Sequence, residues 1–361
     1  MDRHRRALTR AAALLPAVVP VLFIALFFVW PVIAVFARAV RPHAIGDVLG
    51  DGGLRHIMWF TFWQAAVSTA ITVTVGLPVA FVLARFRFRG RALIRTIITI
   101  PFVMPTVVVA AAFLALLRPG GPLAFLGWQR GVGPLLLAHV FFNIAVVVRV
   151  VGAYWSNLDP RTGEAARMLG ATRARVFTDV TLPLLAPAIA GAAAVVFLFT
   201  FTSFGAALLL ADPAHATIEV EVYRQAFFQF DLTTAAALAL LQLVAVIAAL
   251  GLMTVFERRG GVRQRIVASS ESARPPRRGQ RVGVALVLAI AIAALAGPLV
   301  LLAIRSVHVH GRWTLAAYRA LGSSASSNAL FVSPWTALRN SVLFAVVAAI
   351  IAVLVGGLAA M

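Results

Sequence analysis

Two amino acids are missing from this chain of 361 residues: it has no cysteine, and all 32 of its Lys and Arg residues are arginine. Without cysteine the chain has no disulfide framework and no thiolate metal site, and the redox compartment stays open. Without lysine it cannot form a phosphate-binding loop of the type G-x-x-x-x-G-K-[ST]. The chain therefore has no ATPase site of its own, and an ATP-driven process would need a separate subunit.

Charge is also scarce, because only 12% of the residues are charged and 61% are apolar. The apolar residues fall in long uninterrupted blocks, which excludes a soluble domain. About 20 apolar residues in a helix cross the roughly 30 Å of a bilayer core, and a spanning helix satisfies its own backbone. We therefore expect an all-α, polytopic membrane helical bundle. The expected spans are residues 14–37, 59–84, 93–117, 133–153, 186–210, 234–256, 282–304 and 337–361.

The 12 acidic residues all fall outside the interiors of these spans. Asp212, Glu219, Glu221 and Asp231 are expected in loops or at span ends. An ion-coupled secondary transporter is expected to carry acids within its spans, so that class is the less favoured alternative. The chain also has no H-E-x-x-H or G-x-S-x-G motif, and its 7 histidines are scattered, so no catalytic or metal site is predicted.

The arginines are distributed as the positive-inside rule requires. Most of them lie at the N-terminus, between the second and third expected spans, between the fourth and fifth, and in residues 257–281. This bias places the N-terminus in the cytoplasm. A net charge of +20 also raises the question of nucleic-acid binding. That alternative is disfavoured, because only the short turn 85–89 interleaves arginine with aromatic residues.

The chain carries a weak internal repeat. Residues 31–40 and 298–307 end two spans with Pro, Arg and Val in register, and residues 75–80 align with 355–360. Between the two copies lies a segment rich in arginine, serine and proline, as in a solvated linker. We therefore expect a first repeat of six spans at 1–256, a cytoplasmic linker at 257–281 and the start of a second repeat at 282–361. The second repeat is expected to be incomplete, and the sequence to be a truncated or partial chain.

The most specific pattern lies between the fourth and fifth expected spans, at about 159–183. Asp159 is expected to cap a short helix with Pro160 in its first turn. Gly170 suits the left-handed residue that ends this helix, and Thr172 can cap a second one. Leu182-Pro183 is expected to break the second helix and to start the fifth span. The pattern is E-A-A-x3-G-x9-V-x-L-P, formed by Glu164, Ala165, Ala166, Gly170, Val180, Leu182 and Pro183.

This pattern resembles the cytoplasmic loop by which the permeases of ATP-binding-cassette (ABC) importers contact their ATPase. Two further strings, 139–143 and 202–226, are similar to the fused permeases of bacterial thiamine and ferric-iron importers, with the thiamine branch favoured. The resemblance implies a type I ABC importer permease fold with a six-helix repeat in the bacterial inner membrane. It also implies no cofactor, no nucleic acid and no enzymatic activity.

The resemblance further implies two protein partners in addition to membrane lipid: a cytoplasmic ATPase dimer and an extracytoplasmic substrate-binding protein. Closure of the ATPase would drive alternating access, with the small side chains of Ala165 and Ala166 settling into the partner. The binding protein would dock on the outer loops near 211–234 and 306–336. The cargo would be thiamine or its phosphates, with ferric iron as the alternative.

Four polar residues within or near the expected spans are weak candidates for the substrate pathway: His139, Asn143, Gln64 and Gln242. His139 and Asn143 are four residues apart and so share one face of a helix. Polar side chains in hydrocarbon commonly bond across helices. We therefore expect these four residues to form interhelical hydrogen bonds more readily than ligand contacts.

Overall fold

The computed structural model of the protein describes residues 18–39, 41, 43–259, 273–309, 312–319, 321 and 333–359. This part of the chain is helical apart from connecting segments and one antiparallel pair of short strands, β1 (His308–Val309) and β2 (Arg312–Trp313). The predicted all-α membrane bundle is confirmed. The chain divides into two compact units, one formed by residues 1–41 with 303–361 and the other by residues 42–302.

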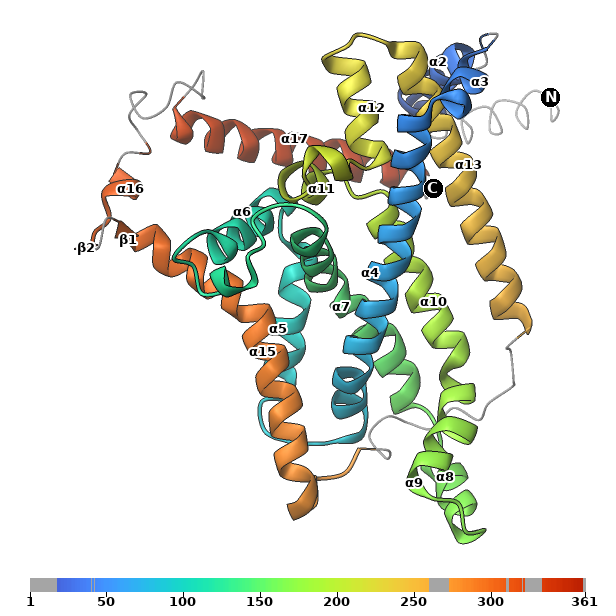
Figure 1. Ribbon diagram of the computed structural model, residues 1–361, viewed down its shortest axis with the longest axis vertical. Coiled ribbons are helices and arrows are strands. Elements are labelled where there is room, and N and C mark those ends of the chain that lie inside the picture. The colour runs from blue at the N-terminus through green and yellow to red at the C-terminus, as the bar shows by residue number, and fades with distance from the viewer. Residues whose placement is uncertain are drawn as a thin grey trace, which may run out of the picture. The chain divides into compact units, whose positions relative to one another are not determined.

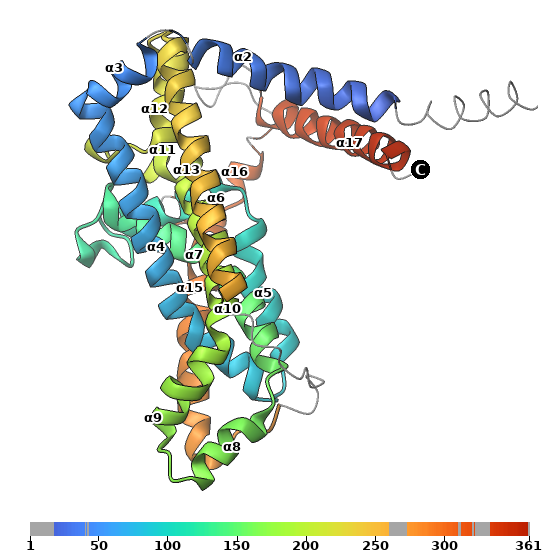
Figure 2. The same cartoon turned by 90° about the vertical axis from the view of Figure 1, so that its right-hand side faces the viewer.

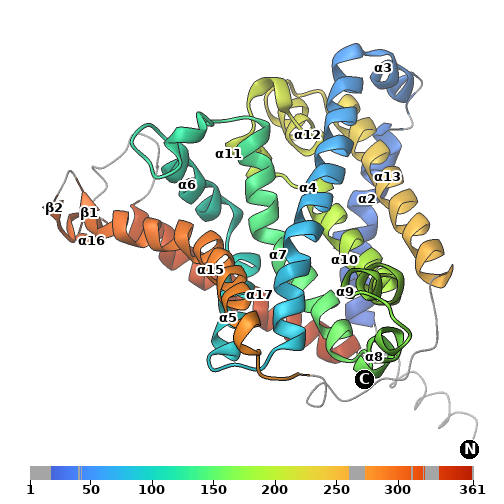
Figure 3. The same ribbon diagram turned by 60° about the horizontal axis from the view of Figure 1, so that its bottom comes forward.

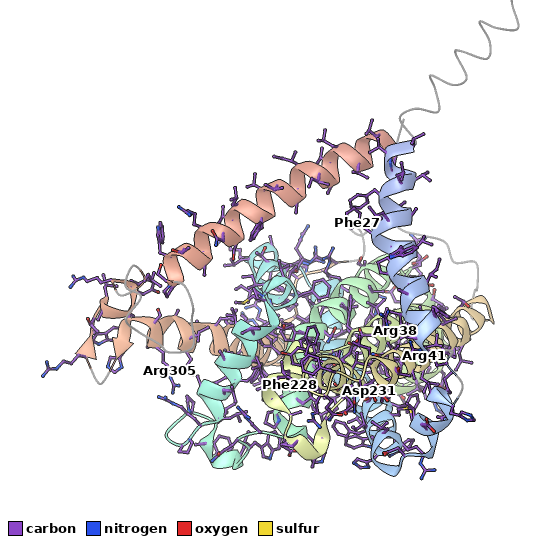
Figure 4. The ribbon with its side chains drawn as sticks, turned by 90° about the horizontal axis from the view of Figure 1, so that it is seen from above. Phe27, Arg38, Arg41, Phe228, Asp231 and Arg305 are labelled. Carbon is purple, nitrogen blue, oxygen red and sulfur yellow. The ribbon has the colours of Figure 1, made fainter. Side chains whose placement is uncertain are left out.

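The first unit contains two apolar helices with almost no buried side chains. One runs from Val18 to Ala39 and includes η1 (Ala25–Val29) and α2 (Trp30–Ala39); the other is α17 (Pro334–Ala359), preceded by the short α16 (Ala316–Arg319). Their most apolar windows have mean hydropathies of 2.8 and 2.9, and only 6% and 0% of those windows is buried. Phe27 stands out from its helix (Figure 4). Apolar surfaces of this kind fit lipid contact.

The second unit is built around three helices, α4 (Gly52–Arg85), α7 (Val132–Ser156) and α10 (Leu182–Phe201), which run alongside one another (Figure 1). Ala80, Val147, Val151 and Leu185 are buried between them. Small residues let the helix backbones approach closely, as is common in membrane proteins. At Gly76, an added Cβ atom would lie 2.8 Å from the Cβ atom of Val147. The α4–α7 contact therefore depends on glycine at this position.

Substitution of Gly76 by alanine should destabilise the second unit. The added methyl group forces α4 and α7 apart, and overpacking of this kind costs about 1–3 kcal/mol, more than the helix propensity that alanine contributes. Gly152 on α7 is the matched control, since its added Cβ would meet Ala80 at 3.8 Å, an ordinary contact. In thermal unfolding in detergent, Gly76→Ala should melt earlier than the wild type and Gly152→Ala should not. Equal melting temperatures would contradict the close approach.

The third expected span, 93–117, is not one continuous helix. It consists of α5 (Arg91–Val103) and α6 (Thr106–Leu117), which meet at an angle of 102°. Met104 precedes Pro105 and has an extended backbone with ψ 145, because a residue before proline is disfavoured in the helical region. The described chain thus has seven helices that could each cross a membrane, or eight spans if the bent pair counts as one.

The fifth expected span, 186–210, is also misplaced. The helix starts earlier, because α9 (Arg173–Arg175), the π-helical η3 (Val176–Thr181) and α10 follow one another without a break and end at Phe201. The chain then turns, and α11 (Gly205–Leu210) is a separate short helix that packs on α6. An added Cβ atom at Gly205 would collide with Thr106 Oγ1 on α6, so this contact leaves no room for a side chain.

The two ends of the second unit carry different short elements (Figure 2). One end has α8 (Pro160–Met168) and α9. The opposite end has α3 (Ala44–Gly50) and α12 (Ile218–Phe227), so the predicted outer loop at 211–234 contains a helix. The other elements of this unit are η2 (Ala124–Leu126), η4 (Pro213–His215), α13 (Leu232–Arg259) and α15 (Arg278–Val307), of which α15 extends past the boundary of the unit. Of the predicted linker, residues 260–272 lie outside the described residues.

Candidate coupling loop and cavities

The loop between α7 and α10 forms a helical hairpin, with α8 as its first arm (Figure 3). The Asp159 carboxylate accepts a hydrogen bond from the backbone N–H of Arg161 at 2.9 Å. At the other end of α8, Gly170 has φ +89. The N–H of Gly170 donates to Arg167 O, and that of Ala171 donates to Ala166 O. These are the two bonds of a Schellman motif, which requires a left-handed residue. The predicted caps of this helix are therefore confirmed.

The tip of the hairpin exposes large apolar side chains. Met168 is 89% exposed and Leu169 is 90% exposed. Glu164 and Ala165 are exposed on the same helix, and Ala166 is partly buried. Met168 and Leu169 were not among the predicted site residues, although two large apolar residues next to a capping glycine in a polar loop were a usable signal. An apolar tip held on a capped helix fits a surface that a protein partner covers.

The two arms of the hairpin pack closely at Gly163. An added Cβ atom there would lie 3.2 Å from Val176 Cγ1 on η3, so an alanine at this position requires a small shift of the Val176 side chain. Thr172 caps the second arm by accepting a hydrogen bond from the N–H of Arg175 at 3.3 Å.

The prediction that Leu182-Pro183 breaks the second helix is wrong. Thr181 has φ −71 and ψ −47, and the helix continues through Pro183 into α10. Proline lacks an N–H, and its ring collides with the carbonyl of the residue four positions earlier in an α-helix. The π-helical turn of η3 lies directly before it, and a wider turn of this type accommodates the ring.

The two parts of the motif lie together in space. Glu164 from α8 and Val180 from η3 line the same cavity of about 350 Å³, together with Asp159 and Thr162. Leu182 and Pro183 are exposed on the outside of the helix. The loop is therefore one structural element from Asp159 to Pro183.

A larger cavity of about 820 Å³ lies among α4, α5, α7 and α10. Arg95 and Arg149 supply positive charge to it, and Phe102 and Phe199 form an edge-to-face pair with ring centroids 5.7 Å apart. The cavity thus combines guanidinium groups with aromatic faces. The sequence did not reveal this cavity, because its residues come from four separate expected spans.

Comparison with known proteins decides the family. The model of the "binding-protein-dependent transport system inner membrane component" family matches residues 74–261, about half of the chain. The chain belongs to this family. It is an inner-membrane permease of the ABC importer type, and the seven long apolar helices agree with a multi-pass membrane protein.

Several curated relatives of the permease are named for a cargo. The thiamine transport system permease protein ThiP of Salmonella typhimurium is 28% identical over 80% of this chain and 54% of the relative. The Escherichia coli protein of that name is 32% identical over 58% of this chain and 40% of the relative. The permease thus spans about half the length of these proteins. The sulfate transport system permease protein CysT of Salmonella typhimurium is 31% identical over 56% of this chain and 76% of the relative.

A solved structure confirms the fold of the permease. A chain from a bacterial ABC transporter involved in the import of the acidic polysaccharide alginate matches with a TM-score of 0.57 and 18% identity. The match covers 72% of the permease and 99% of that chain. This likeness concerns the type I importer fold alone.

The four predicted pathway residues of the permease are tied into hydrogen bonds between and within helices. The Gln64 side-chain amide donates to Thr200 O on α10 at 3.0 Å. His139 Nδ1 lies 3.1 Å from Ser68 Oγ on α4, and Asn143 donates to His139 O at 2.9 Å. None of the four lines the 820 Å³ cavity. Their role in the substrate pathway stays a prediction. Gln64, His139 and Gln242 form the interhelical hydrogen bonds expected from the sequence, whereas the bond of Asn143 stays within α7.

Two acids expected in a loop lie on helix α12 of the permease. Glu221 is buried and its carboxylate is 3.2 Å from the Arg224 guanidinium. The Glu219 carboxylate accepts a hydrogen bond from the Gln242 amide on α13 at 3.1 Å. Burial raises the pKa of the Glu219 carboxyl, although the hydrogen bond from Gln242 lowers it. The fourth predicted pathway residue, Gln242, therefore holds α12 against α13.

Replacement of Glu219 by glutamine should stabilise the permease near neutral pH. A carboxyl whose pKa is raised by folding prefers the neutral form, so its ionisation destabilises the fold as pH rises above the ordinary value of 4.5. Glutamine has no such ionisation. Thermal unfolding between about pH 4 and 8 should show a gain for Glu219→Gln that fades at the acid end. The exposed Glu164→Gln is the control, and the same pH dependence in both variants would refute the assignment.

Proposed function

We propose that this chain is the membrane pathway subunit of an importer for thiamine or its phosphates, driven by a separate ATPase dimer. The observation that carries the proposal is the capped hairpin of residues 159–183 with its exposed tip at Met168 and Leu169. The chain has no lysine for a phosphate-binding loop, so the energy comes from the partner. Movement of the ATPase would reach α10 directly, since η3 continues into that helix.

The arginine distribution supports one orientation of the chain in the membrane. The hairpin end of the second unit carries Arg85, Arg167 and Arg173, so this end and the N-terminus face the cytoplasm under the positive-inside rule. The opposite end, with α3 and α12, faces outward and receives the substrate-binding protein. The second docking segment expected from the sequence, 306–336, contains β1, β2 and α16 among its described residues. In this arrangement 1–256 form the first repeat, and 282–361 begin a second.

The cargo assignment rests on the thiamine permeases among the relatives and on the chemistry of the 820 Å³ cavity. Arginine side chains bind phosphate groups well, and Arg95 and Arg149 line this cavity. The edge-to-face pair Phe102–Phe199 offers faces for aromatic rings. The cavity therefore fits a phosphorylated aromatic cation better than a bare ferric ion, for which the described residues contain no cluster of three or more His, Asp or Glu ligands.

Uptake of labelled thiamine, thiamine diphosphate and ferric iron tests the proposal, in the native organism with and without this gene. We expect selective loss of thiamine compounds in the deletion strain and its recovery on complementation. Selective loss of ferric iron would reassign the cargo but keep the importer class. Uptake that continues in ATP-depleted cells and stops when the ion gradient is dissipated would point to secondary transport and would overturn the proposal.

A further inference from the structure

A basic pocket lies at the base of the hairpin of residues 159–183, separate from the 820 Å³ cavity. It has a volume of about 580 Å³ and is bounded by the end of α4, the hairpin, α7 and the segment that leads into α15. No acidic residue lines this pocket, while the adjoining 350 Å³ cavity, which shares Arg85, Arg167 and Arg274, is also lined by Asp159 and Glu164. The pocket is called the arginine pocket here for its five guanidinium groups, from Arg85, Arg167, Arg173, Arg274 and Arg277.

Backbone hydrogen bonds hold two of these arginines next to each other. The N–H of Arg274 donates to Arg85 O at 3.2 Å, and the N–H of Arg87 donates to Arg274 O at 3.0 Å. The C-terminal part of the predicted linker 257–281 is thereby fixed to the turn that follows α4. Within the described residues, none of the five guanidinium groups forms an ion pair with a carboxylate. Like charges brought together repel, so an anion in the pocket would stabilise this arrangement.

The wall of the pocket nearer the spans is aromatic. The rings of Phe81 and Trp155 are 5.2 Å apart, and Trp155 stacks on Phe177 at 6.3 Å. All three residues line the pocket. Aromatic side chains gather at the level of lipid headgroups in membrane proteins. The arginine pocket therefore combines the two features of a headgroup site, a positive cluster and an interfacial aromatic wall.

We propose that the arginine pocket binds the phosphate headgroup of an anionic phospholipid from the inner leaflet. Guanidinium groups bind phosphate oxygens in pairs of parallel hydrogen bonds, and basic pockets between membrane helices on the cytoplasmic side suit such headgroups. The bound phosphate bridges the hairpin, through Arg167 and Arg173, to the segment before α15, through Arg274 and Arg277. The inference rests on the proposed orientation but is independent of the cargo.

Native mass spectrometry of the purified chain in detergent tests the inference, with phosphatidylglycerol and phosphatidylcholine of the same acyl chains as probes. We expect phosphatidylglycerol to be retained at least about tenfold better, in line with several charge-assisted hydrogen bonds. Arg274→Gln with Arg277→Gln should remove most of this preference. Both residues are exposed, so the fold should tolerate the change, and Arg277→Gln alone serves if the double variant does not fold.

The matched control is Arg278→Gln with Arg281→Gln, which removes the same charge from neighbouring positions that do not line the pocket. This control should keep the lipid preference. Equal loss in both double variants would show a diffuse charge effect and overturn the proposal, as would no loss in either. Displacement of the lipid by millimolar glycerol phosphate would assign the pocket to a soluble phosphate instead. Displacement by the ATPase subunit would assign it to the protein interface.

Discussion

Replacement of Met168 and Leu169 by aspartate should abolish binding of the ATPase subunit while the permease stays folded. The two side chains are 89% and 90% exposed, so their loss removes no packing from the chain itself. In a complex they would be buried, and each large apolar side chain contributes about 1.5–3 kcal/mol when it leaves water. Loss of both corresponds to an affinity at least on the order of 100-fold weaker. Co-purification of the tagged chain with its ATPase measures the effect.

A control for this variant must place the same two charges on exposed aromatic positions outside the hairpin. Phe125 and Phe230 are both 80% exposed, and the double change Phe125→Asp with Phe230→Asp should leave ATPase binding intact. Wild-type affinity in the Met168→Asp, Leu169→Asp variant would mean that the tip is not the docking surface. Comparable loss in both variants would indicate damage to folding or membrane insertion.

The caps of the hairpin could be predicted because their signals are local. Asp159, Pro160, Gly170 and Thr172 each act within one helical turn, and their geometry follows from which backbone groups need partners and which residue tolerates positive φ. The spans could be predicted for a similar reason, since length and apolar composition alone decide whether a helix fits a bilayer.

The features that could not be predicted depend on how a helix accommodates proline and on how helices pack together. Pro183 has the local signature of a helix break, yet η3 widens and the helix continues. At Pro105 the same type of residue does end a helix and bends the span by 102°. The pairing of Arg95 with Arg149 around one cavity, and of Arg85 with Arg274, joins residues far apart in the chain, so no periodicity could reveal it.

Replacement of Gly170 by valine should uncouple transport from the ATPase. Gly170 has φ +89, a conformation that costs a β-branched residue roughly 1–2 kcal/mol or more. No atom lies within 4 Å of its added Cβ, so the effect is backbone strain and not a clash. Relief of that strain breaks the two hydrogen bonds of the Schellman motif. The tip, Met168 and Leu169, then loses its fixed position at the end of α8. We expect uptake to fall at least about tenfold, with the permease still inserted in the membrane.

Two variants separate this mechanism from general destabilisation. Gly120 has φ +76 and equally open surroundings, so Gly120→Val introduces the same strain outside the hairpin and should leave uptake near the wild-type rate. Gly170→Asn should restore most of the activity, because asparagine adopts the left-handed conformation far more readily than valine. If Gly170→Val transported normally, or if asparagine and valine were equally inactive, the left-handed cap would not be what links the ATPase to α10.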